Sequence, residues 1–457
     1  MRILHTSDWH LGQLFYGKSR EQEQSQFLNW LVEQVKTDQI DAVVVAGDLF
    51  DTGTPPSYAR ALYNRFVDQL TQTGCQLVLL AGNHDSVAVL NESQSLLSRL
   101  GASIVAGAED DLSRRLLELK DHTGQVGAIL CAIPFLRARD LVTSQSGQSS
   151  QEKQRELQQV IADHYQQLYL LAKERAEALK AEQPEPVIVM TGHLTALGAS
   201  VSDSVREIYI GTLEGFPADL FPPADYIALG HIHRSQKVAK RENIRYSGSP
   251  IALSFDEAQQ SKSVLRIELS KDQPVQVSPL EVPCFQAMAR IGGDLAKIEQ
   301  QLDQAVEKHL SDQAVEDSAN STTNEINDQA SVDLVANSEE QKADTLWLDI
   351  EVDSQEFLSD LQPRIETMCQ DKPVEVLRIR RQRQLRKLQT TESEKLQLNE
   401  LTVTDVFQRR LELEDWQKEG QGGGGEDGEQ KEQLSERKQR LESCFQQVLD
   451  TLSSPTE

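Results

Sequence analysis

Four short apolar runs in the sequence each lead into a glycine and then into a side chain that can bind a metal ion. The runs cover residues 41–46, 76–81, 187–190 and 226–229, and the motifs after them are Gly47-Asp48, Gly82-Asn83-His84-Asp85, Gly192-His193 and Gly230-His231-Ile232-His233. The runs are too short for helices and too apolar for loops, which predicts buried strands. Helical patterns separate them, as at 151–182, so we expect an α/β fold of βαβ units. Ligands of such sheets bind beyond the carboxyl ends of the strands, where the four motifs would meet.

Histidines gather at these predicted strand ends and in the segment Asp8-Trp9-His10. The chain has nine histidines, and five of them lie in these places: His10, His84, His193, His231 and His233. A lone histidine on an apolar face is more often a core residue, but five placed in this way, together with Asp8, Asp48 and Asn83, favour a binuclear metal centre. Imidazole and carboxylate ligands without thiolate suit Mn, Fe, Zn or Co, whereas an all-oxygen shell suits Mg or Ca.

Asp48 is the residue that we expect to bridge the two ions, because the chain turns away after it and leaves its carboxylate at the strand tip. Two ions about 3.5–4 Å apart need one short bridging carboxylate and separate terminal ligands. Such a pair activates water and neutralises the charge that develops on a phosphoryl group during in-line attack. The residues therefore predict hydrolysis of phosphoesters.

The ordered motifs resemble those of the calcineurin-like metallophosphoesterases and, within that family, those of the SbcD nuclease subunits. Asp8-Trp9-His10 and the four strand-end motifs occur in the family's order and at similar spacing. The segments 5–12, 51–60, 206–212 and 246–250 extend the resemblance, which covers about residues 1–310 and 347–416. The resemblance implies a four-layer α/β sandwich in which two β-sheets are flanked by helices.

The resemblance also implies a role for each site residue. One ion would be held by Asp8, His10, Asp48 and His233, and the other by Asp48, Asn83, His193 and His231. His84 would not bind metal but would contact the scissile phosphate and stabilise the transition state or the leaving oxygen. Asp85 is expected either to orient and charge His84 or to stabilise the turn. Some relatives have a second histidine where this chain has Asp51, which we expect to support Asp48 from behind.

A change of pattern near Pro279 predicts a domain boundary. We expect a nuclease domain at 1–278, a small α+β capping domain at 279–390 and partner-docking helices at 391–457. The capping domain should contain strands at 346–352 and 374–379, a helix at 355–369 and a disordered insertion at 311–345, where nine acidic residues accompany Lys342 alone. Five glycines at 420–425 separate two amphipathic helices. These helices pack either on their own protein or, as the resemblance implies, on an SMC-like ATPase of the SbcC type.

The net charge of −26 repels nucleic acid at long range, so DNA binding has to rest on local features. Residues 231–245 carry five Lys or Arg against Glu242 alone, and residues 377–389 carry six with no acid. Both runs are suited to phosphates, although a solvated face would explain either and a partner contact would explain the second. Tyr16, in the loop after the first motif, and Arg234, among the predicted ligands, are the residues that we expect to touch DNA.

These features predict a metal-dependent DNA nuclease with two divalent ions, of which Mn is preferred over Mg, Fe or Zn. The resemblance implies double-strand exonuclease and single-strand or hairpin endonuclease activity in DNA repair, replication and recombination. It also implies a homodimer of this chain within a heterotetramer with the SbcC-type ATPase. No Walker A pattern occurs in the sequence, so ATP hydrolysis would belong to that partner.

Two alternative functions are weaker. A phosphatase or cyclic-nucleotide phosphodiesterase of the same fold would need neither a cap nor docking helices. An inactive scaffold that only recruits an ATPase would be expected to lack ligands, and all seven are present.

A membrane-spanning or secreted chain is not expected. The longest purely apolar run is about six residues, 128–133, whereas a bilayer helix needs about 20. Cleavage of an N-terminal signal would remove Asp8 and His10. Five scattered cysteines without a Cys-x-x-Cys pair indicate neither a disulfide framework nor a zinc knuckle, so we expect the chain to act in the cytoplasm.

Overall fold

The computed structural model describes residues 1–107, 111–141, 149–197, 199–200, 215–323, 345–353 and 360–381. The chain divides into two units, Met1–Arg383 and Gln384–Glu457. Several predictions lie outside the described residues: the docking helices with their glycine hinge, the flanking motif at 206–212 and the end of the second basic run at 382–389.

The first of two six-stranded sheets carries the first three site motifs. Its order is β14-β13-β1-β4-β5-β6, with bounds β1 Arg2–Thr6, β4 Ala42–Ala46, β5 Gln76–Leu80, β6 Ala102–Val105, β13 Ser263–Ser270 and β14 Gln273–Glu281. Strands β1, β4, β5 and β6 are parallel, and β13 and β14 extend one edge in antiparallel fashion. The connecting helices are α1 (Glu21–Thr37), α2 (Ser57–Thr71), α3 (Val87–Glu92) and α4 (Gln94–Arg99).

The second sheet carries the last two site motifs and has its own covering helix. Its order is β11-β12-β10-β9-β8-β7, with bounds β7 Leu116–Lys120, β8 Val126–Cys131, β9 Val187–His193, β10 Tyr226–Gly230, β11 Gln236–Lys237 and β12 Ile244–Tyr246. Helix α6 (Ser150–Leu179), predicted at 151–182, begins with a capping box between Ser149 and Glu152 and packs Tyr165 and Leu168 into the core of this sheet. Short helices at α5 (Ala138–Leu141), η1 (Leu112–Arg115) and η2 (Ala218–Leu220) complete this half.

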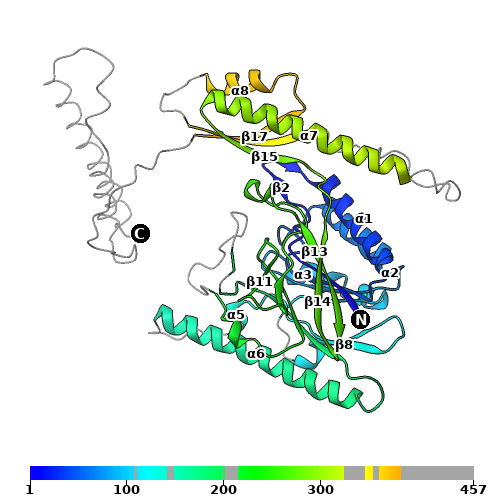
Figure 1. Ribbon diagram of the computed structural model, residues 1–457. Coiled ribbons are helices and arrows are strands. Elements are labelled where there is room, and N and C mark those ends of the chain that lie inside the picture. The colour runs from blue at the N-terminus through cyan, green and yellow to red at the C-terminus, as the bar shows by residue number, and fades with distance from the viewer. Residues whose placement is uncertain are drawn as a thin grey trace. The chain divides into compact units, whose positions relative to one another are not determined.

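Alternate residues of each central strand pack in opposite directions, which produces four layers. In β4, Val43 and Val45 join the core beneath α1 and α2, whereas Val44 joins the core between the two sheets. Figure 1 shows α6 on the opposite side of the sheets from α1 and α2. The predicted four-layer α/β sandwich is therefore confirmed. Because the strands are buried on both faces, their sequences are continuous apolar runs and do not alternate.

The domain that was expected to act as a cap, and that is called the cap below, is a three-stranded parallel sheet with helices packed on it. Its strands are β15 (Met288–Gly293), β16 (Leu346–Val352) and β17 (Val374–Arg381), and its helices are α7 (Leu295–Thr323) and α8 (Leu361–Cys369). The prediction of a disordered insertion from 311 was wrong for 311–323, because α7 continues to Thr323. A helix already anchored on the cap core by Ile298 and Leu302 extends at low cost for each added residue. Residues 324–344 are not among the described residues.

An aromatic cluster joins the cap to the two-sheet domain that carries the site motifs. Phe15, in the hairpin formed by β2 (Leu14–Phe15) and β3 (Lys18–Ser19), stacks on Trp347 of the cap with ring centroids 5.6 Å apart. Phe255, which begins the 3-10 turn η3 (Phe255–Glu257), lies 5.0 Å from Phe15. Lys18 also forms an ion pair with Glu375. The hairpin after the first site motif is thus held between the two domains.

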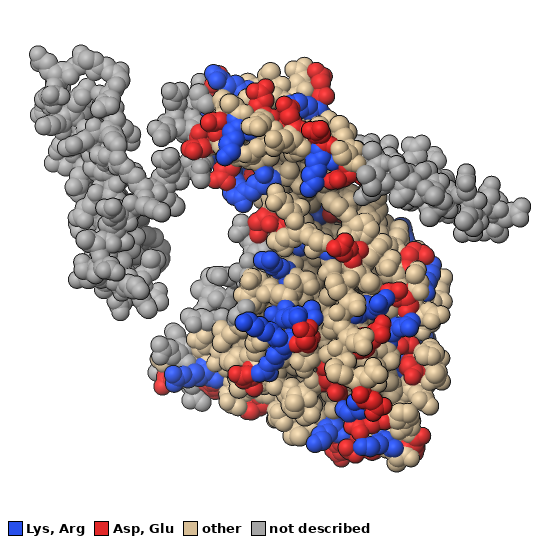
Figure 2. Space-filling model, viewed as in Figure 1, with Lys and Arg blue, Asp and Glu red and all other residues tan. Residues whose placement is uncertain are grey.

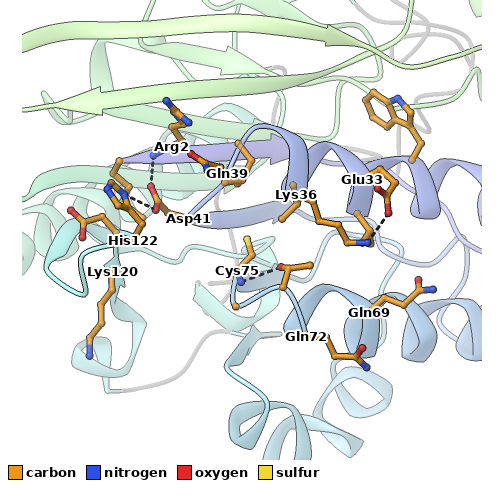
Figure 3. A pocket seen from close by; sticks show the side chains of 18 of the residues that line it. Arg2, Glu33, Lys36, Gln39, Asp41, Gln69, Gln72, Cys75, Lys120 and His122 are labelled. Carbon is orange, nitrogen blue, oxygen red and sulfur yellow. Dashed lines mark hydrogen bonds and ion pairs between the residues drawn. The ribbon is translucent and has the colours of Figure 1, made fainter. Parts of the chain in front are cut away.

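A cavity lies at the other end of the strands from the site motifs. It encloses about 1530 Å³ and is lined by Arg2, Asp41, Cys75, Lys120 and His122 among others (Figure 3). These residues precede or flank the amino ends of the strands, so the cavity contains none of the predicted site residues. No helix among the described residues is long and apolar enough to cross a bilayer.

Candidate metal centre

The carboxyl ends of β1, β4, β5, β9 and β10 bring the predicted ligands together. Candidate ligand atoms lie within 4.8 Å of one another in three overlapping groups: Asp8, His10 and His233; His10, Asp48 and His84; Asp48, His193 and His231. Asn83 completes the cluster, with its Oδ1 atom 3.0 Å from His193 Nε2 and 2.9 Å from His231 Nδ1. All seven residues expected to bind metal therefore converge on one buried place.

Asp48 lies at the middle of this cluster. Its Oδ2 atom is 3.1 Å from His193 Nε2 and 3.7 Å from His10 Nε2, so one carboxylate reaches both groups of ligands. Its Oδ1 atom accepts a hydrogen bond of 2.9 Å from the backbone N–H of His84. This placement is the geometry expected of a bridging ligand.

Four predicted ligands, of which His231 has a φ angle of 96°, have left-handed backbone conformations that residues other than glycine rarely adopt. The φ angles are 55° for Asp8, 46° for His10 and 52° for Asp48. Hydrogen bonds between the two loops hold them there: Asp8 N–H donates to the Gly47 carbonyl oxygen at 2.9 Å, and His10 N–H donates to that of Asp48 at 3.0 Å. The fold thus maintains a strained backbone at this site, which aims the side chains inward.

The glycines before the ligands are required by the close approach of the strand ends. A β-carbon on Gly82 would lie 2.1 Å from Asp48 Oδ1, and one on Gly47 would lie 2.2 Å from His193 Nδ1. A β-carbon on Gly230 would lie 2.0 Å from the carbonyl oxygen of Ala46. Any larger residue at these positions would push the ligands apart, which explains the Gly-ligand pattern of the sequence.

The electrostatics of the cluster favour a bound cation. Burial disfavours the charged form of His193, but the adjacent Asp48 carboxylate outweighs burial and raises the pKa of His193 to about 9. Burial and the neighbouring His193 lower the pKa of His231 to about 3. The buried His10 Nε2 and Asn83 Nδ2 atoms have no hydrogen-bond partner. The unpartnered His10 Nε2 atom and the negative charge of the buried Asp48 carboxylate fit a site for divalent metal ions.

His84 lies beside the cluster and, like Asn83, is only partly buried. Its ring is edge-on to that of His10, with centroids 4.7 Å apart. Its Nδ1 atom is 2.7 Å from the carbonyl oxygen of Asp51, which can only accept, so Nδ1 carries the proton. Burial lowers the pKa of His84, despite the nearby Asp48. The other ring nitrogen, Nε2, is then the one available to a substrate.

Two expectations about acidic residues need correction. Asp85 does not contact the His84 ring; its carboxylate accepts the backbone N–H groups of Gly82, Leu49 and Phe50 at 2.8–3.1 Å. It therefore has the alternative role of stabilising the turn, because buried backbone donors need an acceptor. Burial and the charge of Asp48 raise the pKa of Asp85 to about 6. Asp51, which was expected to lie behind Asp48, contacts His10, with its Oδ1 atom 3.1 Å from His10 Nδ1.

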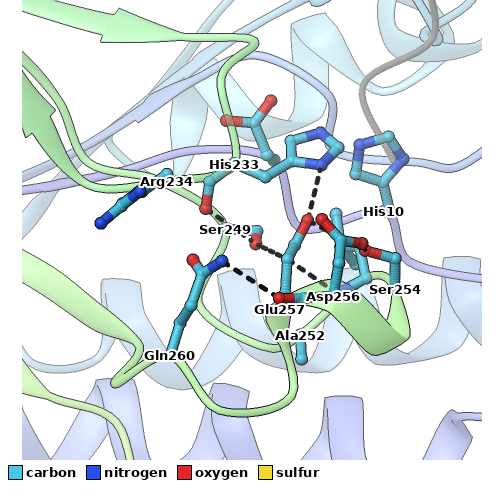
Figure 4. A network of polar contacts seen from close by, with 12 residues as sticks. His10, His233, Arg234, Ser249, Ala252, Ser254, Asp256, Glu257 and Gln260 are labelled. Atoms are coloured by element: carbon cyan, nitrogen blue, oxygen red, sulfur yellow. Dashed lines mark hydrogen bonds and ion pairs between the residues drawn. The ribbon is translucent and has the colours of Figure 1, made fainter. Parts of the chain in front are cut away.

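The residues expected to touch DNA are accessible. Tyr16 is 45% exposed, and the guanidinium carbon of Arg378 from the cap lies 4.8 Å from the centre of its ring. Arg234 is exposed beside the metal ligands and points away from the His233 ring in Figure 4. The rest of the first basic run is partly neutralised, because Glu242 pairs with Lys237 and Arg245. Acidic and basic side chains alternate over much of the face in Figure 2.

Sequence reasoning missed two residues that hold the ligands in place. The Gln24 side chain, from α1, donates to the His10 carbonyl oxygen at 2.9 Å and accepts from Gly12 N–H at 3.1 Å. Glu257 approaches His233. The sequence could have indicated a structural role for Gln24, because it is a polar residue on the apolar face of its helix. No sequence pattern could have indicated the role of Glu257, since its partner His233 is distant in the sequence.

Comparison with known proteins places this geometry in a family. The model for calcineurin-like phosphoesterases matches residues 1–235, and the model described as the type 5 capsule protein repressor C-terminal domain matches residues 284–415. The chain is 47% identical to the SbcD subunit of the nuclease SbcCD of Escherichia coli K12 over 457 residues, which is 100% of both chains. The chain belongs to the SbcD nuclease family. SbcD proteins of Rhodobacter capsulatus and Bacillus subtilis are 36% and 34% identical, over 62% and 59% of this chain and 70% and 66% of theirs.

Membership of the SbcD family defines the class of activity. The chain is a phosphodiester hydrolase with a calcineurin-like metallophosphoesterase domain, and such domains use a dimetal centre. The predicted nuclease is therefore confirmed over the phosphatase, the cyclic-nucleotide phosphodiesterase and the inactive scaffold.

Proposed function

We propose that this SbcD chain is the metal-dependent subunit that hydrolyses DNA phosphodiesters in a complex with an SbcC-type ATPase. It would act as an exonuclease on double strands and as an endonuclease on single strands and hairpins, in DNA repair, replication and recombination in the cytoplasm. The relatives are named as subunits of a nuclease, SbcCD, which supports the partner and the substrate. The observation that carries the proposal is the single Asp48 carboxylate within reach of both groups of histidine ligands.

We assign the seven converging residues to two metal ions, with Mn preferred because the ligands mix imidazole with carboxylate. The first set is Asp8, His10, Asp48 and His233, and the second is Asp48, Asn83, His193 and His231. When bound, the ions supply activation of water and neutralisation of charge on the phosphate. Asp48 belongs to both sets and so fixes their positions relative to each other. Asp51 orients the His10 ring by its contact with His10 Nδ1.

His84 is the residue that we propose to act on the substrate. Its Nδ1 atom is fixed on the Asp51 carbonyl oxygen, so the ring presents Nε2 to the site. In its protonated form Nε2 can donate to a non-bridging or leaving oxygen of the phosphodiester, where charge develops. Asp85 supports this role only through the shape of the turn that carries His84.

The other parts of the chain would bring DNA and the partner to this site. Tyr16 and Arg234 are proposed to contact the DNA backbone, and the cap at 279–390 is proposed to restrict which DNA ends reach the metals. The contact between Phe15 and Trp347 supports this arrangement, because it places the cap beside the loop that follows His10. Residues 391–457 are proposed to dock on the ATPase, in a heterotetramer that contains two copies of this chain.

The test uses the full chain with Mn or Mg, with and without the ATPase, on linear, hairpin and single-stranded DNA. Asp48→Ala and His231→Ala should abolish cleavage, whereas His122→Gln, a distant histidine whose side chain is 82% exposed, should retain it. His84→Gln should keep both metal ions and DNA but lose about 100-fold to 1000-fold in turnover, the scale of one lost oxyanion donor. Strong cleavage by Asp48→Ala would contradict the assigned centre, and metal loss in His84→Gln would make His84 a ligand.

A further inference from the structure

Glu257 is a buried carboxylate at the end of the turn η3, directly behind one of the assigned ligands. Its Oε1 atom is 3.5 Å from His233 Nδ1 (Figure 4). The Glu257 side chain has no exposed surface, and neither resemblance nor motif singles it out. A buried charge requires partners, and the identity of those partners indicates what the residue does.

The other oxygen of Glu257 is held by three donors. Lys262 Nζ donates to Oε2 at 2.6 Å, the backbone N–H of Leu253 donates at 3.1 Å, and Ser249 Oγ donates at 3.4 Å. The carboxylate therefore cannot rotate freely, and its Oε1 atom stays directed at His233. This is the arrangement of a fixed acceptor, not of a flexible surface acid.

Lys262 fixes both members of the pair. Besides Glu257, its ammonium group donates to the carbonyl oxygen of His233 at 3.2 Å and to Ser249 Oγ at 2.9 Å. The buried ion pair therefore contacts His233 twice: Lys262 binds its backbone carbonyl oxygen, and Glu257 faces its ring. Ser249 N–H also donates to the His233 carbonyl oxygen, at 3.1 Å.

We propose that Glu257 is a positioning residue of the metal centre, which holds His233 with Nδ1–H toward its carboxylate and Nε2 toward the metal. A carboxylate can only accept, so Nδ1 must carry the proton and Nε2 keeps its lone pair. Carboxylates behind ligating histidines orient the ring and increase its basicity, and their removal costs roughly 10-fold to 100-fold in metal affinity. The inference rests on the binuclear centre proposed above.

The experiment measures Mn²⁺ binding to the full chain by electron paramagnetic resonance, which counts the bound ions and gives the affinity of each site. Glu257→Gln should weaken one of the two sites by about 10-fold to 100-fold and leave the other unchanged. Glu257→Gln leaves the buried ammonium group of Lys262 without its charged partner, which can destabilise the fold by itself. A second variant, Glu257→Gln with Lys262→Met, therefore removes both charges of the pair. It should fold with a melting temperature near that of the wild type and still show the defect at one site. Glu281→Gln, on an exposed acid of β14, is the matched control and should bind both ions normally.

A double-mutant cycle separates positioning from simple destabilisation. His233→Ala should weaken the same site, and adding Glu257→Gln to it should cause no further loss. Full Mn²⁺ affinity in the double charge-removal variant, or an additional loss in the His233→Ala background, would overturn the proposal. Failure of the wild-type chain to bind two ions would instead refute the metal centre itself.

Discussion

Gly82→Ala tests whether the close packing of strand ends sets the metal geometry. The added β-carbon would lie 2.1 Å from Asp48 Oδ1 and 2.3 Å from Asp48 N, whereas real β-carbons stay beyond 3.0 Å. Since both the side chain and the backbone of Asp48 obstruct the new atom, a change of rotamer cannot relieve the clash. Asp48 and Gly82 must separate by about 0.9 Å, the difference between 3.0 and 2.1 Å.

This separation moves the residue on which both sets of ligands depend. A misplacement of about 1 Å in an active site costs about 100-fold in rate. We therefore expect kcat for the Mn-dependent hydrolysis of bis(p-nitrophenyl) phosphate to fall about 100-fold. This small diester reports on the metal centre without the demands of DNA or the cap.

The control is Gly53→Ala, in the loop after Asp48. Its β-carbon would make only an ordinary contact, 3.6 Å from Ser86 Cβ, so its activity should match that of the wild type. Circular dichroism during heating checks that both variants are folded. Activity of Gly82→Ala within threefold of the wild type would show that the centre tolerates this displacement, contrary to the reasoning.

Two further predictions concern the cap. The buried Asp349 carboxylate accepts from Arg378 and Arg380 at 2.6–3.2 Å, so Asp349→Asn should lower the free energy of unfolding by roughly 2 kcal/mol at pH 7. Burial alone would raise the pKa of Asp349, but the two arginines outweigh burial and lower it from 3.8. The stabilisation by the Asp349 carboxylate should therefore be complete above about pH 4 and be lost as the pH falls further. Urea unfolding at pH 7 and pH 3 checks this, since equal losses at both pH values would exclude the linkage. Trp347→Ala should cost about 3 kcal/mol, because the ring is 8% exposed and stacks on Phe15. A shift in the urea midpoint equivalent to less than 1 kcal/mol would mean that the ring contributes little to the contact.

The strand ends and the ligand cluster could be predicted because their signals are local. An apolar run followed by glycine and a ligand identifies both the strand and the place where it ends, as in β4 and Asp48. The limit of this rule is visible in β9, which was expected to end at 190 but continues to His193. Strand pairing with β10 extends to His193, opposite Gly230, and sequence alone does not reveal that partner.

The roles of single acids could not be predicted, because a carboxylate accepts from whichever donor the fold brings near. Asp85 was expected either to orient the adjacent histidine or to stabilise the turn, and the sequence could not decide, because the N–H groups of Leu49 and Phe50 that it accepts come from another loop. The contact of Asp51 with His10 was not foreseen for the same reason. The docking of Phe15 on Trp347 joins residues far apart in the chain, and no pattern links them.

The turn η3 contacts the cap at one end and the metal centre at the other. Phe255 packs against Phe15 and hence against the cap, and two residues later Glu257 faces His233. A single 3-10 turn is short and tightly wound, so little movement is absorbed between its ends. Tilting of the cap on this seat would therefore change the angle at which the His233 ring faces the other ligands.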